Sequence, residues 1–308
     1  MEFANQRTAY GQALLELGKK NPNVVALEAD LGKSTMSYLF GEAFPERYFE
    51  MGIAEANMVS TAAGLAASGK IAFCSSFAVF ASGRAYDQTR QTVSIGKLNV
   101  KICGSSSGLS DFGDGSTHQA VEDVSIMSAI PNMTVLTPCD ATEARKAVFA
   151  AAEVEGPVYI RVVRNDVPTY TSESDPYEIG KLRVLAEGSD VALVAHGTML
   201  EVAMKTRELL AAKNISAMVV NIGTMKPFDS DGIREIAKGV KAVVTAEEHT
   251  RIGGLAAQTA MALCRTATPL DYVAIDDEFG QSAHSAIELQ QHYGLTPEIM
   301  AEKALALL

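Results

Sequence analysis

The stretch Phe49-Glu50-Met51-Gly52-Ile53-Ala54-Glu55-Ala56-Asn57-Met58 sets one carboxylate, that of Glu55, among small and apolar neighbours. We expect little water around it, and a carboxyl group that loses its water holds its proton more tightly. Such a group can share a proton with a nitrogen of a heterocyclic ring. The alternative is that Glu55 only favours the first turn of a helix over residues 56–67, since a negative charge there suits the helix dipole. This stretch by itself favours the second interpretation.

The composition is that of an ordinary globular protein. A chain of 308 residues with 47% hydrophobic content is long enough for two domains with cores of their own. The net charge of -11 argues against a nucleic acid or a membrane surface as a partner, because the field of the protein repels phosphate. An anionic substrate must then be held by local arginines. The sequence has neither a signal-peptide pattern nor an apolar run that could span a bilayer, so we expect a cytoplasmic protein.

The four cysteines show neither metal-ligand spacing nor close pairing in the sequence. Free or buried thiols therefore fit better than a zinc site or a disulfide framework. We expect no metal site on this chain.

Short β-branched runs alternate with Ala-rich helical stretches, which is typical of parallel sheets flanked by helices. The predicted strands cover residues 24–27, 70–74, 100–103, 133–136, 158–162, 191–195, 217–221, 242–246 and 271–274, and the clearest later helices cover 199–213 and 297–307. The polar segment 165–176 interrupts the pattern with turn residues. The prediction is an α/β protein of two domains, each a mainly parallel sheet flanked by helices, with residues 1–168 and 187–308 as domains and 169–186 as the linker.

Phe77 and Phe80 follow a predicted strand, and ligands of parallel-sheet proteins bind at the carboxyl ends of strands. Side chains three residues apart share one face of a helical turn, so the two rings could form a wall for a flat ligand. Two aromatic residues at this spacing are more often plain core.

The loop Gly113-Asp114-Gly115-Ser116-Thr117-His118-Gln119 collects groups that exchange protons. Asp114 can accept a hydrogen bond from a substrate hydroxyl, and His118 can titrate near neutral pH. A single loop histidine is usually just solvated. A glycine-rich turn and a neighbouring carboxylate make a functional role for His118 more plausible.

Taken in this order, these segments resemble the pyrimidine-binding and C-terminal domains of the transketolase family, over essentially all 308 residues. The strongest parts of the resemblance are Gly52-Ile53-Ala54-Glu55, Phe77 with Phe80, Asp114-Gly115-Ser116-Thr117-His118-Gln119, and Gly156-Pro157-Val158-Tyr159-Ile160-Arg161-Val162-Val163-Arg164. One such segment is a weak signal, whereas four in register are a strong one.

The resemblance implies thiamine diphosphate as the cofactor and a role for each matching residue. Glu55 would contact the aminopyrimidine nitrogen, Phe77 and Phe80 would line the pocket of that ring, and Asp30 with Leu31 would approach the thiazolium. Asp114 and His118 would contact and orient substrate hydroxyls and assist proton transfer. The sugar phosphate would be held by Arg7, Ser34 and Arg164, and a planar guanidinium can grip a phosphate with two hydrogen bonds.

Departures from the family pattern matter as well. Gly104-Ser105-Ser106-Ser107 stands where a typical transketolase has a histidine that contacts the donor sugar, and the third aromatic residue of the ring pocket falls near Gly83. Gly113-Asp114-Gly115 is not followed by the paired asparagines of a diphosphate and magnesium motif. The whole diphosphate-binding domain is missing.

The chain therefore resembles one subunit of a split transketolase, which transfers a two-carbon ketol unit between sugar phosphates. The partner subunit would supply the diphosphate-binding domain and hold Mg²⁺ or Ca²⁺. Self-association through the pyrimidine-binding and C-terminal domains would give an α2β2 assembly. We expect the carboxyl-terminal domain, including His196 and residues 247–249, to pack against neighbouring subunits rather than to form a site.

Three alternatives remain. A subunit similar to deoxyxylulose-phosphate synthase would use pyruvate as donor and release carbon dioxide. The β subunit of a 2-oxo-acid dehydrogenase has the same two-domain layout, but its His-Ser-Gln-Ser stretch is absent where Thr117-His118-Gln119 lies. A non-catalytic transketolase-like binding partner is the third alternative, and intact Glu55, Asp114 and His118 argue against it.

Overall fold

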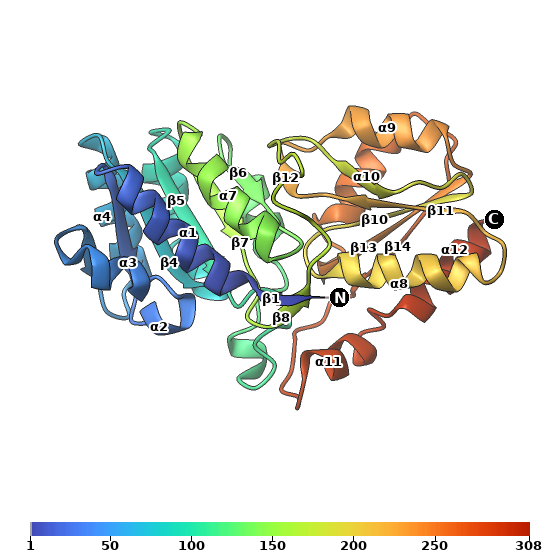
Figure 1. Cartoon of the computed structure of the whole chain (residues 1–308), viewed down its shortest axis with the longest axis horizontal. Coiled ribbons are helices and arrows are strands. Elements are labelled where there is room, and N and C mark those ends of the chain that lie inside the picture. The colour runs from blue at the N-terminus through green and yellow to red at the C-terminus, as the bar shows by residue number, and fades with distance from the viewer. Residues whose placement is uncertain (1) are drawn as a thin grey trace.

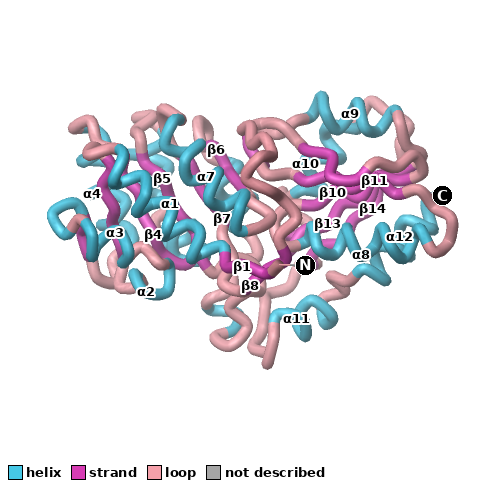
Figure 2. Tube along the Cα trace, viewed as in Figure 1, coloured by secondary structure: helices cyan, strands magenta, loops and turns pink. Residues whose placement is uncertain are grey.

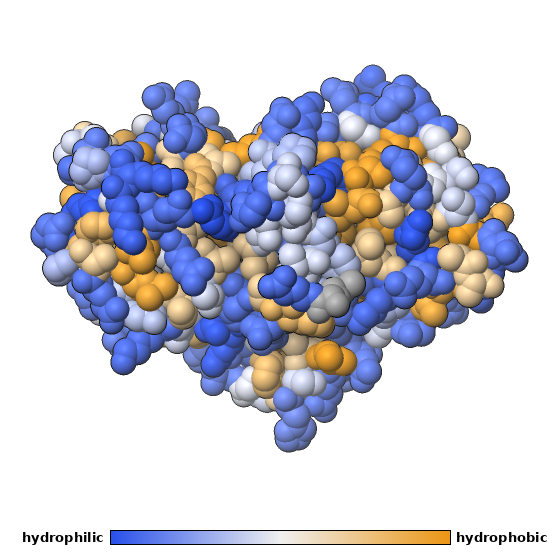
Figure 3. Space-filling model, in the orientation of Figure 1, coloured by the Kyte–Doolittle hydropathy of each residue, from blue (hydrophilic) through white to orange (hydrophobic). Residues whose placement is uncertain are grey.

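The structure, a computed structural model, describes residues 2–308 and folds them into two α/β domains that lie side by side (Figure 1). Each domain has a mainly parallel sheet between layers of helices, which confirms the expected fold class. Much of the surface in Figure 3 is hydrophilic, with separate apolar patches over both domains. Within the described residues no helix is both long and apolar enough to cross a membrane.

The first sheet has seven strands in the order β3-β2-β4-β5-β7-β6-β12, and all but β12 run parallel. Its strands are β2 (Val24–Glu28), β3 (Tyr48–Glu50), β4 (Ile71–Phe77), β5 (Val100–Ser105), β6 (Thr134–Leu136), β7 (Val158–Arg161) and β12 (Thr224–Lys226). Because its other strands are parallel, their carboxyl ends meet at one edge of the sheet, where ligands bind in such folds.

The second sheet has five strands in the order β14-β13-β10-β11-β9, with only β9 antiparallel. Its strands are β9 (Arg183–Ala186), β10 (Val191–Ala195), β11 (Ala217–Asn221), β13 (Ala242–Thr250) and β14 (Leu270–Ile275). β9 lies inside the segment expected as linker. After β11 the chain returns to the first domain, where β12 pairs with β6 as the edge strand.

Helices cover both faces of each sheet (Figures 1 and 2). The helices of the first domain are α1 (Gln6–Lys20), α2 (Gly32–Thr35), α3 (Tyr38–Ala43), α4 (Glu55–Ala67), α5 (Tyr86–Gln88), α6 (Asp123–Ala129) and α7 (Ala141–Glu153). Those of the second are α8 (Met199–Ala211), α9 (Ser230–Lys238), α10 (Leu255–Leu263), α11 (Ala286–His292) and α12 (Pro297–Leu307).

Single turns complete the fold. They are the 3₁₀ turns η1 (Pro45–Arg47) and η4 (Gly115–Thr117) and the π-helical turns η2 (Phe80–Arg84) and η3 (Thr89–Ser94). π-Helical turns are rare and occur frequently at functional sites. One hydrophobic cluster combines buried side chains of α4 and the first sheet with those of α10 and the second sheet, so the cores of the two domains are continuous.

A short antiparallel pair brings the two ends of the first domain together. β1 (Phe3–Asn5) pairs with β8 (Asp166–Pro168), and the side-chain amide of Asn5 donates to the carbonyl of Arg164 at 2.9 Å. The side chain of Asn5 also accepts from two N–H groups of α1 and caps that helix. This pairing places Arg7, in the first turn of α1, next to Arg164.

A buried ion pair of the first domain is linked to the second domain by a hydrogen bond. The guanidinium of Arg161 in β7 donates to Asp123 in α6 at 3.0 Å and to the backbone carbonyl of Glu248 in β13 at 2.9 Å. The hydroxyl of Tyr159 donates to the same Asp123 carboxylate at 2.8 Å. All of these side chains are buried. We call Arg161, Asp123, Tyr159 and Glu248 the interface network.

We expect Asp123→Ala to lower the free energy of unfolding by about 3–5 kcal/mol, because it leaves the buried guanidinium of Arg161 without its carboxylate. Chemical denaturation of the full chain measures this. The control is Glu235→Ala, which breaks an exposed ion pair with Lys238 and should cost less than about 0.5 kcal/mol. Equal losses in both variants would show that the interface network does not stabilise the fold.

His196 generates a prediction on acid stability. It follows β10 and is fully buried, and burial is the largest cause, ahead of the charge of Arg161, that lowers its pKa to about 3. An unfolded histidine takes up its proton near pH 6.5, so this group destabilises the fold progressively as pH falls from 6.5 toward 3.

His196→Gln cannot take up that proton. Between pH 7.5 and pH 5 the parent should therefore lose about 2 kcal/mol more of its unfolding free energy than the variant does. Denaturation curves at both pH values measure the difference. Parallel losses in parent and variant would mean that His196 does not contribute to acid denaturation.

Candidate functional site

Two pockets at the carboxyl ends of the first sheet collect the residues singled out in the sequence. The first has a volume of about 320 Å³, which is within the range of ligand sites. We call it the Glu55 pocket, and it is lined by Ala29, Asp30, Leu31, Ile53, Glu55, Phe80, Arg84, Thr117 and His118. Residues from four separate stretches of the sequence thus meet in one pocket.

Glu55 is the first residue of α4 and is only 3% exposed, so the expected scarcity of water around it is confirmed. It is not alone, however. The guanidinium of Arg84 lies 3.1 Å and 3.3 Å from its two carboxylate oxygens. A buried charge requires such a partner. Arg84, four residues after Phe80, was not predicted to have a role at the site.

The two aromatic rings stack, with centroids 6.1 Å apart and planes at 14°. Phe77 is the last residue of β4 and Phe80 begins the π-helical turn η2, so the single helical turn expected for both is wrong. Phe80 lines the Glu55 pocket, whereas Phe77 backs it. His118 meets the Phe80 ring edge-on at 5.3 Å, and the guanidinium of Arg84 lies over that ring at 4.1 Å. Arg84 therefore stacks on the Phe80 ring. It directly follows Gly83, near which the family's third aromatic residue would fall.

Asp30 and Leu31 enter the Glu55 pocket from the loop after β2. Asp30 has a left-handed backbone with φ of 62°, which is uncommon for a residue other than glycine and recurs at functional sites. The carboxylate of Glu50 accepts hydrogen bonds from the N–H of Asp30 at 2.7 Å and from that of Gly52 at 3.0 Å. Glu50 therefore holds the loop of Asp30 against the loop that leads to Glu55. Sequence reasoning did not identify this role.

The second pocket is larger, at about 450 Å³, and more polar. We call it the arginine pocket, and it is lined by Asn5, Arg7, Ser110, Asp111, Phe112, Gly113, Asp114, Arg164, Asn165 and Asp166. Arg7 donates to the backbone carbonyl of Ser34 at 2.8 Å, so Ser34 is brought beside Arg7, but it is not among the lining residues. Burial, and then the nearby charge of Arg164, lower the pKa of Arg7.

The loop from Asp111 to Gln119 separates the two pockets and lines both. Asp114 faces the arginine pocket, with a carboxylate oxygen 3.9 Å from Arg164, and His118 faces the Glu55 pocket. The structure therefore places these two predicted residues on opposite sides of one loop. Gly115 between them has φ of 77°, a conformation that favours glycine.

Asp111 was not predicted, yet it makes the shortest ion pair of the arginine pocket. Its carboxylate lies 2.8 Å from the Arg164 guanidinium, and its side chain is 2% exposed. Burial raises the pKa of Asp111, against the opposing effect of Arg164 and with a further increase from Asp114. The sequence around Asp111 does not mark it as a site residue, because its role depends on Arg164, which lies 53 positions away.

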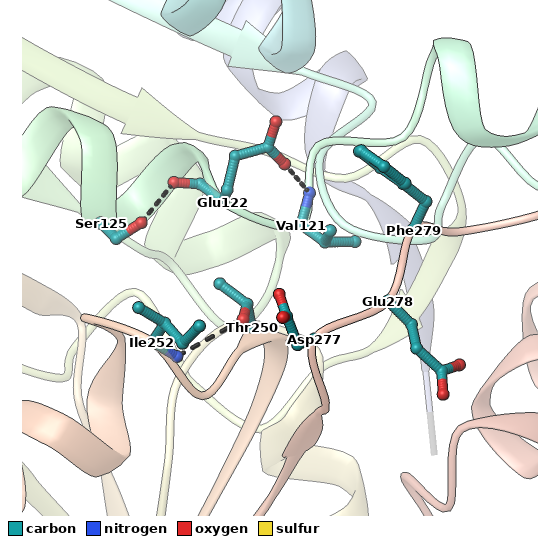
Figure 4. A pocket seen from close by; sticks show the side chains of 8 residues that line it. All are labelled: Val121, Glu122, Ser125, Thr250, Ile252, Asp277, Glu278 and Phe279. Carbon is teal, nitrogen blue, oxygen red and sulfur yellow. Dashed lines mark hydrogen bonds between the residues drawn. The ribbon is translucent and has the colours of Figure 1, made fainter.

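A third pocket, of about 330 Å³, lies between the two domains (Figure 4). Val121, Glu122 and Ser125 line it from the first domain and Thr250, Ile252, Asp277, Glu278 and Phe279 from the second. Phe279 is 80% exposed and Ile252 is 58% exposed, so this region presents apolar side chains to the outside. None of the predicted site residues lines this pocket.

His196 and residues 247–249, which were not expected to form a site, are buried at the domain interface. The Glu247 carboxylate accepts from two N–H groups at the start of α10, and His249 accepts from the N–H of Ser125 at 3.2 Å. Across residues 2–308, no group of three His, Cys, Asp or Glu side chains lies close enough together to hold a metal ion.

Two family models match the chain. One is described as the transketolase pyrimidine-binding domain and matches residues 4–169, and the other is described as the transketolase C-terminal domain and matches residues 180–300.

Two curated relatives match over nearly their whole lengths. A putative transketolase C-terminal section of Methanocaldococcus jannaschii is 42% identical, over 98% of this chain and 96% of its own. A 6-deoxy-6-sulfo-D-fructose transketolase subunit of a Clostridium species is 41% identical, over 97% and 92%. Among solved structures, a split-gene transketolase described as an inactive β4 tetramer is 44% identical, with a TM-score of 0.90 and 99% of both chains covered.

Proposed function

The chain belongs to the transketolase family, and on this premise we propose that it is one subunit of a split, thiamine diphosphate-dependent transketolase of the cytoplasm. It would transfer a two-carbon ketol unit between sugar phosphates together with a second subunit. The observation that carries this proposal is the pair of adjoining pockets. A buried carboxylate beside an aromatic ring lies on one side of the loop 111–119, and two arginines lie on the other.

The Glu55 pocket fits a flat heterocycle with a ring nitrogen. Its volume, the half-buried ring of Phe80 in its lining and its one buried carboxylate provide both an aromatic contact and a hydrogen bond to such a ring. Asp30, Leu31, Glu55 and Phe80 would contact thiamine diphosphate, with Phe77 behind Phe80. When bound, the cofactor supplies the electron sink for carbon–carbon bond cleavage.

The side chains of this chain would handle protons and position the sugar. Glu55 would exchange a proton with the ring nitrogen, for which Arg84 must release the carboxylate. His118 and Asp114, from opposite sides of their loop, would bind substrate hydroxyls, and His118 lies near enough to the Phe80 wall to serve a reacting carbon there. Arg7, Arg164 and the segment of Ser34 would hold the terminal phosphate at the far end of the sugar.

Relatives described as a transketolase C-terminal section, a transketolase subunit and a split-gene transketolase support a partner subunit. The partner would carry the diphosphate-binding domain and the Mg²⁺ or Ca²⁺ ion. The exposed Phe279 and Ile252 beside the interdomain pocket support self-association, since large apolar side chains on a surface mark contacts with other chains (Figure 4). The assembly would be α2β2.

We expect the purified chain alone neither to bind thiamine diphosphate tightly nor to turn over sugar phosphates, because half of the cofactor site belongs to the partner. Mixing with the partner subunit should restore both. Calorimetry measures cofactor binding, a coupled assay measures ketol transfer, and light scattering measures the mass of the assembly. Micromolar cofactor binding by the chain alone would contradict the proposal, and carbon dioxide release from pyruvate by the complex would favour the synthase-like alternative.

Glu55→Gln should reduce the activity of the reconstituted complex by about 10²-fold or more, because the amide keeps the size of the side chain but cannot exchange a proton. Deuterium uptake at C2 of the bound cofactor, followed by NMR, should slow by a similar factor. If Glu55 only favours the start of α4, the change costs at most about 1 kcal/mol of stability and leaves both rates within a few fold of the parent.

A further inference from the structure

A carboxylate of this chain already pairs with one arginine of the arginine pocket. The carboxylate of Asp111 lies 2.8 Å from the same guanidinium of Arg164 that would grip the end of a substrate. An opposite charge at this distance satisfies part of the guanidinium's hydrogen-bonding capacity before any ligand arrives. A ligand anion must therefore displace Asp111 or bind beside it.

Hydrogen bonds to its backbone hold Asp111 in place in the pocket. Its backbone carbonyl accepts hydrogen bonds from the N–H of Gly115 at 3.3 Å and from the side-chain amide of Gln119 at 3.2 Å. The carboxylate is buried, and its second oxygen, Oδ2, has no hydrogen-bond partner. Leaving Arg164 would strand a buried negative charge, which is costly unless it takes up a proton.

The charges that line the pocket do not favour a highly charged ligand. Arg7 and Arg164 provide two positive groups, while Asp111, Asp114 and Asp166 provide three carboxylates. Each further negative charge of a ligand is repelled most by Asp111, which is buried against Arg164, and least by Asp166, which is exposed and pairs with Asn5 instead of Arg164. A terminal group with a single charge meets half the repulsion that a dianion does.

We propose that Asp111 determines the charge specificity of this pocket, selecting substrates whose terminal group carries one negative charge over those whose terminal group carries two. This inference rests on the proposed function for its substrate, a sugar, but its charge argument concerns the arginine pocket alone. The fitting class is a sugar with a terminal sulfonate or a singly ionised phosphate. A fully ionised phosphate binds only at the cost of proton uptake by Asp111.

The pocket therefore links anion binding to pH. The charged and titratable groups that face Asp111 are Arg164, Arg7, Asp114 and His118. Burial already raises the pKa of Asp111, and a dianion beside it favours the protonated form further. Affinity for a dianion should rise as pH falls, and this dependence should shrink when Asp111 can no longer ionise.

The first test uses this chain alone, since the structure forms the arginine pocket from residues of this chain. Sulfate remains a dianion across the pH range of the experiment and serves as the probe, with binding followed by NMR. Asp111→Asn should bind sulfate about tenfold more tightly than the parent at pH 7.5. The gain should narrow at pH 5.5, where Asp111 of the parent is more often protonated.

The matched control is Asp166→Asn, which removes an acid of the same pocket that makes no ion pair with Arg164. It should change sulfate affinity less than threefold. Asp111→Ser provides a second variant if the amide perturbs the loop, and thermal unfolding checks the fold of each. Equal sulfate affinity in the parent and both Asp111 variants, or no sulfate binding by any of them, would overturn the inference.

The second test uses the reconstituted complex with one aldose acceptor in two forms, bearing a terminal phosphate or a terminal sulfonate. The ratio of kcat/KM for phosphate over sulfonate should rise about tenfold in Asp111→Asn and stay within twofold in Asp166→Asn. An unchanged ratio in Asp111→Asn would overturn the inference. An inactive complex would instead contradict the proposed function, while the sulfate titration would still decide the role of Asp111.

Discussion

The buried guanidinium of Arg161 is the interaction on which the arrangement of the two domains depends. It extends from β7 in the first sheet, meets Asp123 at the start of α6 and reaches the carbonyl of Glu248 in β13. Removing a guanidinium from water costs several kcal/mol unless its donors find partners, and here the partners come from both domains. Separating the domains would replace the bond from Arg161 to the Glu248 carbonyl with water.

The same constraint shapes the loop between the two pockets. Glu248 extends its carboxylate to the N–H of Leu109 at 3.2 Å, and Gln119 at the far end of the loop donates to the carbonyl of Gln281. Gly108 has φ of 60°, and a Cβ atom there would lie 2.0 Å from the Glu248 carboxylate. The carboxyl-terminal domain therefore positions the loop that carries Asp111, Asp114 and His118, a role beyond the packing against other subunits that the sequence suggested.

The predictable part of the fold is the part whose signal is local. Buried parallel strands are continuous apolar runs, so β10 and β11 have the bounds that the sequence predicts, and α12 begins at Pro297 as expected. β1, β8 and β12 were not predicted as strands. Each has three residues and exists because of a distant partner, as in the pairing of Phe3 with Pro168, and such pairing leaves no periodic trace.

The candidate site divides in the same way. The structure brings Glu55, Phe80 and His118, each marked by a sequence motif, into one pocket. Glu55 begins α4, whereas Phe80 and His118 lie in segments that follow parallel strands. Arg84, Asp111 and Glu50 were not predicted, because each acquires its role from a residue in another segment of the chain: Glu55, Arg164 and Asp30, respectively. Arg84 covers the Glu55 carboxylate and Asp111 covers the Arg164 guanidinium. Glu55 and Arg164, one in each pocket, are thus already paired, so a ligand that engages either of them exchanges one ionic partner for another, and the net affinity is the difference between the two.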